Sequence, residues 1–218
     1  MTVINLDLTL LSQLLKYNLD CSRREDRKVT ITSQEELMHL KDKNNVSHLI
    51  VKGNIKLNPW LGWYSRLRTL EIYNNEVDKQ LNRITLPCCK KLICKWNILL
   101  QTLPNIPNCE DIICSRNSLT ILPKLDKCIT LDCYGNRITS LPDLPNCKDL
   151  CCSSNSITEL PQLSECVTLN CSCNNLTEIS IDLSKCETLY CSYNELTSIS
   201  DLPKCIKLCC ENNNLNGV

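Results

Sequence analysis

The stretch that decides the fold is LCCSSNSITELPQLSECVT, residues 150–168, because the chain then begins the same pattern again. From Leu169 it reads LNCSCNNLTEISIDLSKCET. In both copies a Cys follows the first Leu by two residues, and an Asn follows it by five. Matching positions in consecutive copies indicate an internal repeat.

The repeat runs through most of the 218 residues. Nine copies align on a first Leu or Ile with spacings of 19 to 22 residues: Leu49, Leu70, Leu92, Ile112, Leu131, Leu150, Leu169, Leu189 and Leu208. An Asn follows each start by five residues: Asn54, Asn75, Asn97, Asn117, Asn136, Asn155, Asn174, Asn194 and Asn213. A fixed period near 20 residues is typical of a solenoid.

The pattern C-x-x-L-x-C-x-x-N-x-L-T-x-L-P-x-L-P resembles the leucine-rich repeat, whose strand segment reads L-x-x-L-x-L-x-x-N-x-L. The resemblance covers about residues 46–218 and is nearest to the short LPX repeat of bacterial secreted effectors. The Cys-rich form is also similar to leucine-rich repeat proteins of large DNA viruses. The resemblance implies an α/β solenoid dominated by β structure, with a parallel concave sheet of about nine strands and an extended convex side.

The expected interior follows from strand geometry. Alternate residues of a strand face the same side, so the first Leu of each copy and the residue two positions later both point inward. Each Asn also turns inward, where a buried amide needs backbone partners. Short copies with frequent Pro leave little room for a helix on the return side.

Cysteine accounts for 19 residues, and 14 of them fall on inward positions. One ladder lies two residues after the start: Cys94, Cys114, Cys133, Cys152, Cys171, Cys191 and Cys210. The other lies three residues before it: Cys89, Cys109, Cys128, Cys147, Cys166, Cys186 and Cys205. A free Cys packs as a small hydrophobe. A disulfide scaffold or a zinc site would also use Cys, but the count is odd and only His39 and His48 could assist. We therefore expect reduced thiols, a reducing compartment, no metal and no cofactor.

Residues 1–45 depart from the repeat and are expected to form a helical N-terminal cap on the solenoid of residues 46–218. The spacing of Leu residues predicts a helix near 7–18. Residues 29–31 favour a strand, and Ser33 begins a capping box that opens a helix ending near Asp42. The alternative is a partner-binding or localisation segment.

Outward strand positions would form the concave face, and several carry residue types that are frequent in binding hot spots. The candidate partner-binding residues are Tyr73, Lys95, Trp96, Arg116, Asp132, Tyr134, Tyr190 and Tyr193. Small outward residues between them would leave room for a partner: Ser115, Ser153, Ser154, Ser172 and Ser192. A second patch comprises Trp60, Trp63 and Tyr64, which would either pack the cap or form an interface.

The formal net charge is zero, but residues 1–100 carry 16 Lys and Arg against 10 Asp and Glu, and the remainder has the opposite imbalance. A nucleic-acid-binding module that uses the basic N-terminal half is thus the alternative to a protein-binding one, although zero net charge makes it the weaker hypothesis. No apolar run is long enough to span a membrane, and the N-terminus makes a poor signal peptide. We expect the protein to be cytoplasmic, with the cytoplasm of a host cell as one such location.

Catalysis is not expected, because the chain has two His and no Gly-rich phosphate-binding loop. Some LPX effectors carry a ubiquitin-ligase domain with a C-x-D motif, which Cys109-Glu110-Asp111 and Cys147-Lys148-Asp149 match. Both Cys lie on a buried ladder, so the ligase hypothesis is limited to a substrate-targeting part without its catalytic domain. The sequence predicts a non-enzymatic interaction module, a viral or bacterial factor that binds a host protein through its concave face.

Overall fold

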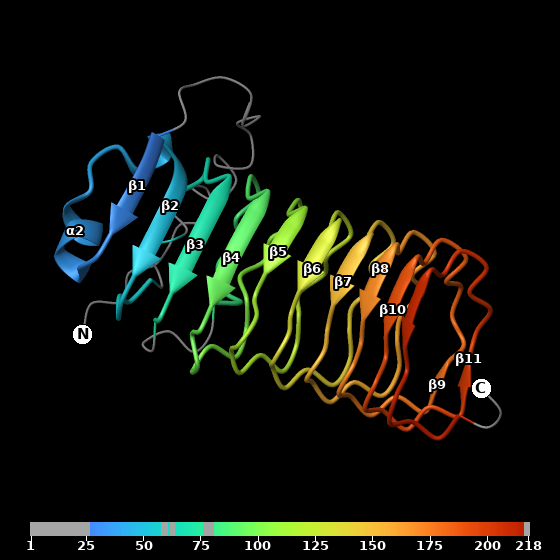
Figure 1. Cartoon of the computed structure of the whole chain (residues 1–218). Helices are drawn as coiled ribbons and strands as arrows, with labels where there is room; N and C mark the ends of the chain where they lie inside the picture. The colour runs from blue at the N-terminus through green and yellow to red at the C-terminus, as the bar shows by residue number, and fades with distance from the viewer. Residues whose placement is uncertain (1–26, 58–60, 62–63, 76–80, 216–218) are drawn as a thin grey trace.

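The strands of the chain stack side by side into one long parallel sheet, with return segments behind it (Figure 1). This computed structural model describes residues 27–57, 61, 64–75 and 81–215. The sheet has ten strands in the order β1-β2-β3-β4-β5-β6-β7-β8-β10-β12. The order of the strands in the sheet is the order in which they occur along the chain. Each turn of the chain therefore adds one strand to the end of the sheet.

Strand length falls from the N-terminal turns to the later ones. The sheet comprises β1 (Arg27–Ile31), β2 (Val46–Lys52), β3 (Thr69–Tyr73), β4 (Lys91–Lys95), β5 (Asp111–Ile113), β6 (Thr130–Asp132), β7 (Asp149–Cys151), β8 (Thr168–Asn170), β10 (Thr188–Tyr190) and β12 (Lys207–Cys209). On the return side, β9 (Glu178–Ile179) pairs in parallel with β11 (Ser198–Ile199). The return segments described between residues 96 and 215 contain no helix, as the short copies and their prolines predict.

The strand register reproduces the sequence alignment. Leu49 is the partner of Leu70, Leu70 of Leu92, and the same correspondence continues to Leu208. A slip by one residue would turn each inward side chain to solvent, so the hydrophobic pattern fixes this register. The predicted solenoid of about nine leucine-rich turns is confirmed.

The core is a continuous column of Leu, Ile and Cys between the sheet and the return segments. The first residues of the copies are at most 2% exposed from Leu49 to Leu189, whereas Leu208 in the last turn is 43% exposed. Twelve of the 14 ladder cysteines are buried, and Cys205 and Cys210 of the last turn are partly buried. The ladder positions therefore belong to the core, as predicted.

The repeated Asn joins each turn to the one before it. Asn155 donates from Nδ2 to the carbonyl oxygens of Cys152 in its own turn and Cys133 in the preceding turn, at 3.0 Å each. Its Oδ1 accepts from the backbone N–H of Ile138, also at 3.0 Å. Asn136, Asn174, Asn194 and Asn213 make the same three contacts. These bonds satisfy backbone groups that the loop would otherwise bury unpaired.

Three elements precede the first leucine-rich turn in the described chain. The strand expected near residues 29–31 is β1, which pairs with β2 and places Val29 opposite Leu49. The helix α2 (Gln34–His39) has Ser33 as its N-cap and a complete capping box with Glu36. It buries Leu37 against the core and ends at His39, three residues before the predicted end. A short 3-10 helix, η1 (Lys43–Asn45), follows. The helix predicted near 7–18 lies outside the described residues.

Candidate interaction surface

The concave face consists of three columns of residues, which lie one, three and four positions after each copy's start. The first column contains Glu71, Asp132 and Tyr190, the second Tyr73, Lys95 and Tyr134, and the third Trp96, Arg116 and Tyr193. The parallel register holds equivalent members about 4.8 Å apart from strand to strand. The eight candidate partner-binding residues therefore lie on one continuous face.

The third column has an unusual backbone that the sequence analysis missed. All nine of its members have positive φ angles between 53° and 87°: Gly53, Asn74, Trp96, Arg116, Gly135, Ser154, Cys173, Tyr193 and Asn212. A non-glycine residue in this left-handed region costs about 1–2 kcal/mol. Gly or Asn at four of the nine positions was the available signal, because these residues tolerate the conformation best.

Hydrogen bonds to the next turn hold the third column in place. The backbone N–H of Arg116 donates to the carbonyl of Tyr134 at 2.8 Å, and that of Gly135 donates to Ser153 at 3.0 Å. The same contact recurs at Gly53, Trp96, Ser154, Cys173 and Tyr193. Because these bonds continue the ladder past the strand ends, they offset the strain of the left-handed residues.

Three of the predicted residues meet in a cation–π stack formed by Trp96, Arg116 and Tyr134. The Arg116 guanidinium carbon lies 4.2 Å from the centre of the Trp96 ring and 5.3 Å from that of Tyr134. Trp96 remains 50% exposed, so the stack is open to solvent on one side. Exposed aromatic and Arg side chains held in fixed positions are suited to binding.

The remaining predicted residues lie along the same face, some of them several strands from this stack. Lys207 places its Nζ 4.9 Å from the centre of the Tyr190 ring, and Tyr193 is 61% exposed. Asp132 accepts a hydrogen bond from the backbone N–H of Tyr134 at 3.1 Å. Lys95 is half-buried beside Trp96. Lys207, one residue before the start of the last copy, was missed because no residue type is shared by all the copies at that position.

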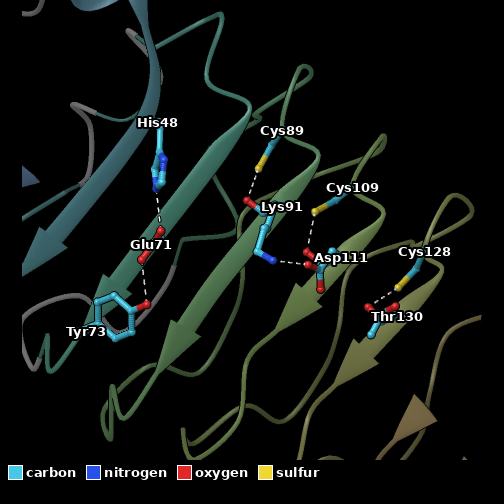
Figure 2. Close-up of polar contacts among 9 residues, drawn as sticks. All are labelled: His48, Glu71, Tyr73, Cys89, Lys91, Cys109, Asp111, Cys128 and Thr130. Carbon is cyan, nitrogen blue, oxygen red and sulfur yellow. Dashed lines mark hydrogen bonds and ion pairs between the residues drawn. The ribbon is translucent and has the colours of Figure 1, made fainter. Parts of the chain in front are cut away.

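At the N-terminal end of the face, three side chains form a hydrogen-bonded chain (Figure 2). Glu71 contacts His48 Nε2 at 2.6 Å and accepts from the Tyr73 hydroxyl at 2.8 Å. Burial alone would raise the pKa of Glu71, but the hydrogen bonds from Tyr73 and His48 lower it overall. Burial and the bond to Glu71 raise the pKa of Tyr73 to about 12. A shallow depression of about 530 Å³ opens here, lined by Ile50, Lys52, Gly53, Glu71, Tyr73 and Asn74.

The outward serines require a correction. Ser115, Ser153 and Ser192 occupy the second column, as predicted, but they are only 6–9% exposed. Ser192 donates to Glu211 Oε2 at 2.6 Å, which shows how a larger neighbour covers the small residue. These three serines are therefore not accessible to a partner, whereas Ser154 and Ser172 are partly exposed.

The second predicted patch is described only at Tyr64, since Trp60 and Trp63 lie outside the described residues. Tyr64 is 1% exposed, and burial raises its pKa to about 12. A side chain this buried favours the packing interpretation of the patch over the interface one.

The ladder cysteines use their thiols as hydrogen-bond donors. In the ladder before each strand, every Sγ donates to the carbonyl two residues later, at 3.3–3.6 Å. Figure 2 shows three of these contacts, from Cys89, Cys109 and Cys128. In the inward strand ladder, burial raises the pKa of Cys94 and Cys191 to about 12, which keeps these thiols protonated. A Leu side chain could fill the space but could not donate.

Among the residues that the structure describes, 17 cysteines are free, and Cys88 is an exception to the expected reduced state because it is disulfide-bonded. Cys88 lies outside both ladders, so the prediction for the ladder thiols is unaffected. Cys109 and Cys147, the two matches to the C-x-D motif, are at most 1% exposed. A thiol that substrate cannot reach cannot act as a ligase nucleophile. In the described part of the chain, no cluster of three or more His, Cys, Asp or Glu could hold a metal, and no helix is long and apolar enough to cross a bilayer.

Comparison with solved structures places this geometry among known proteins. YopM, a leucine-rich effector protein from Yersinia pestis, is 30% identical over 78% of this chain and 48% of its own, with a TM-score of 0.62. The chain has the fold of a leucine-rich repeat protein. It spans about half the length of that YopM structure.

Two further similarities are too loose to carry an argument. YopM from Yersinia enterocolitica is 18% identical over 79% of this chain and 60% of its own, with a TM-score of 0.37. A Leptospira interrogans leucine-rich repeat protein is 16% identical over 87% and 72%, with a TM-score of 0.38. No family model matches the sequence, and neither does any curated protein.

Proposed function

We propose that this leucine-rich repeat protein is a non-enzymatic interaction module, a viral or bacterial factor of the short LPX type that binds a host protein through its concave face. The cation–π stack of Trp96, Arg116 and Tyr134 is the observation that carries the proposal. Covering an exposed Trp with a partner is favourable, and aromatic and Arg side chains dominate binding hot spots. The description of the similar Yersinia pestis protein as an effector supports the same class.

The test is affinity capture from host-cell lysate under reducing conditions. One variant combines Trp96→Ala with Tyr134→Ala, and a second combines Tyr190→Ala with Tyr193→Ala. Ile121→Ala serves as the control, because Ile121 is 59% exposed on the return segment, away from the concave face. Circular dichroism verifies that each variant folds.

The proposal expects a captured protein that is lost with at least one concave-face variant and retained with Ile121→Ala. Capture that neither variant changes would contradict the concave-face site. Capture of nuclease-sensitive material alone, with a steep dependence on salt, would instead favour the nucleic-acid alternative.

We also propose that the protein works in the reducing cytoplasm, including that of a host cell. The free ladder thiols support this location, whereas the disulfide at Cys88 argues against it. The two possibilities, a reduced protein and one with a disulfide at Cys88, can be distinguished by experiment. The protein is isolated without reductant, unfolded in denaturant and treated with an alkylating reagent. Reaction at all 19 cysteines is expected for the reducing compartment. Two unreactive cysteines would contradict it.

A further inference from the structure

The cation–π stack leaves one part of Arg116 free to bind. The guanidinium carbon of Arg116 lies over the ring of Trp96 and over that of Tyr134. The N–H groups of a guanidinium lie in its plane, so the rings leave their edge open. A carboxylate binds such an edge with two parallel hydrogen bonds, and the stacking holds the fork in position beforehand.

No neighbouring carboxylate neutralises Arg116. Within the described chain, Arg116 and Lys95 take part in no ion pair. The closest acidic residues along the sheet have other partners. Glu110 and Asp111 pair with Lys90 and Lys91 at 2.5 Å each, and Asp132 accepts from a backbone N–H. Lys95 and Arg116 therefore give the surface around the stack two positive charges without an ion-pair partner in the described chain, and Asp132 lies at its edge.

Two exposed apolar residues, called the apolar ledge below, follow Trp96 along the chain. Ile98 and Leu99, which follow Trp96 in the same turn, are 55% and 39% exposed. The buried residue of this turn is Leu100, eight residues after Leu92, whereas in the later turns the corresponding residue lies seven after the start, as Leu119 does after Ile112. The additional residue pushes two apolar side chains into solvent beside an exposed Trp. Their separation of three residues keeps all of them within about 11 Å of chain.

We propose that Lys95, Trp96, Ile98, Leu99, Arg116 and Tyr134 form a docking site for a short acidic segment of a partner protein, in which an Asp or Glu lies next to a large apolar residue. The inference rests on the proposed function and specifies its partner. The carboxylate would take the edge of Arg116, and the apolar side chain would lie on Trp96 and the apolar ledge.

The charge pattern favours an acidic peptide over single-stranded nucleic acid. A nucleic-acid backbone needs a cationic track along several strands. Here the positive area ends at β6, where the first column carries Asp132, and Asp149 on β7 is exposed and makes no ion pair in the described chain. The positive area is large enough for one carboxylate of a peptide that also carries a neighbouring apolar residue.

The experiment is a selection of random heptapeptides on the folded full chain, followed by affinity measurements with the best synthetic peptide. We expect selected peptides to carry Asp or Glu beside Leu, Ile, Phe or Trp. Arg116→Gln should weaken binding at least tenfold. Lys207→Gln is the matched control, because Lys207 also stacks on an aromatic ring but lies five strands away, and it should change affinity less than twofold.

A second peptide, with its Asp or Glu replaced by Asn or Gln, tests the contact without altering the protein. It should bind wild type at least tenfold more weakly, and Arg116→Gln should then have no further effect. Failure to select any peptide, a neutral or basic consensus, or indifference to Arg116→Gln would each overturn the inference. Binding of an oligothymidine probe that Arg116→Gln abolishes would assign the site to nucleic acid instead. The proposed function survives these results if a host protein is still captured and is lost with the Tyr190→Ala, Tyr193→Ala variant.

Discussion

The first turns of the solenoid are wider than the later ones, and their interiors differ accordingly. The copies that begin at Leu49 and Leu70 are 21 and 22 residues long and carry strands of five to seven residues, whereas later copies have 19 or 20 residues and, from β5, strands of three. At the position two after the start, the wide turns place Val51 and Ile72, and each later turn places Cys. A shorter turn encloses less space, so the inward side chain is smaller. The Asn ladder and the left-handed third column, by contrast, continue through both regions.

The largest effect is expected in the Asn ladder, at a turn of the narrow region. Asn155→Ala leaves the carbonyls of Cys133 and Cys152 and the N–H of Ile138 without their partner. We expect a loss of about 3 kcal/mol in the free energy of unfolding, measured by urea denaturation. Ser156→Ala, at the exposed next position, is the control and should change little. An equally small effect at Asn155 would show that water replaces the amide.

A second substitution tests whether turn width selects the inward residue. Cys152→Ile places in a narrow turn the side chain that Ile72 supplies in a wide one, and Cys152 is fully buried. Overpacking should destabilise the protein by about 2 kcal/mol in the same urea experiment. A stabilising Cys152→Ile would refute the link between turn length and Cys.

A third pair of variants should behave alike in both regions. Gly53 in a wide turn and Gly135 in a narrow one both have positive φ, and an added Cβ would meet no atom closer than 3.7 Å at either site. Gly→Ala should therefore cost about 1 kcal/mol at each position through backbone strain alone. The measurement is the unfolding midpoint in urea, with Ser154→Gly as the reverse change. A stabilising Ser154→Gly and equal losses at both glycines are expected; unequal losses would mean that turn width also affects the third column.

The smallest effect concerns the hydrogen-bonded chain that only the wide turns contain. Burial is the largest cause of the raised pKa of Tyr73, and the Glu71 carboxylate adds to it; Glu71→Gln removes that charge, so the pKa of Tyr73 should fall below about 12. Absorbance at 295 nm across the alkaline titration reports the change. Glu110→Gln, which breaks the Lys90 ion pair elsewhere, should leave the curve as it is. An unaltered titration with Glu71→Gln would mean that burial alone sets the pKa.

The sequence allowed the regular features to be predicted because each repeats in nine copies. A single Leu or Cys indicates little on its own. The repeated apolar start positions from Leu49 to Leu208, together with the Asn five residues after each, predict the strand register, the inward faces and the Asn ladder. The Ser33 capping box was equally readable, since its signal is local.

Features that depend on contacts between different side chains were not predictable. The burial of Ser115 depends on the larger residues around it, and the cation–π stack depends on Trp96 and Tyr134 meeting the same guanidinium. The positive φ of Trp96 or Arg116 is imposed by hydrogen bonds to the next turn, against the preference of the residues themselves. Such features arise from tertiary structure, which repeat spacing does not encode.

The direction of the Asn contacts has a consequence for how such a protein can change in length. Each Asn reaches back to the preceding turn, so a turn brings with it the groups that its own attachment requires. Duplication of a 19-residue copy such as residues 150–168 would add a turn that packs against the original copy through contacts the fold already uses. The solenoid can therefore be lengthened by whole repeats, and the outward residues of each added repeat can then vary independently.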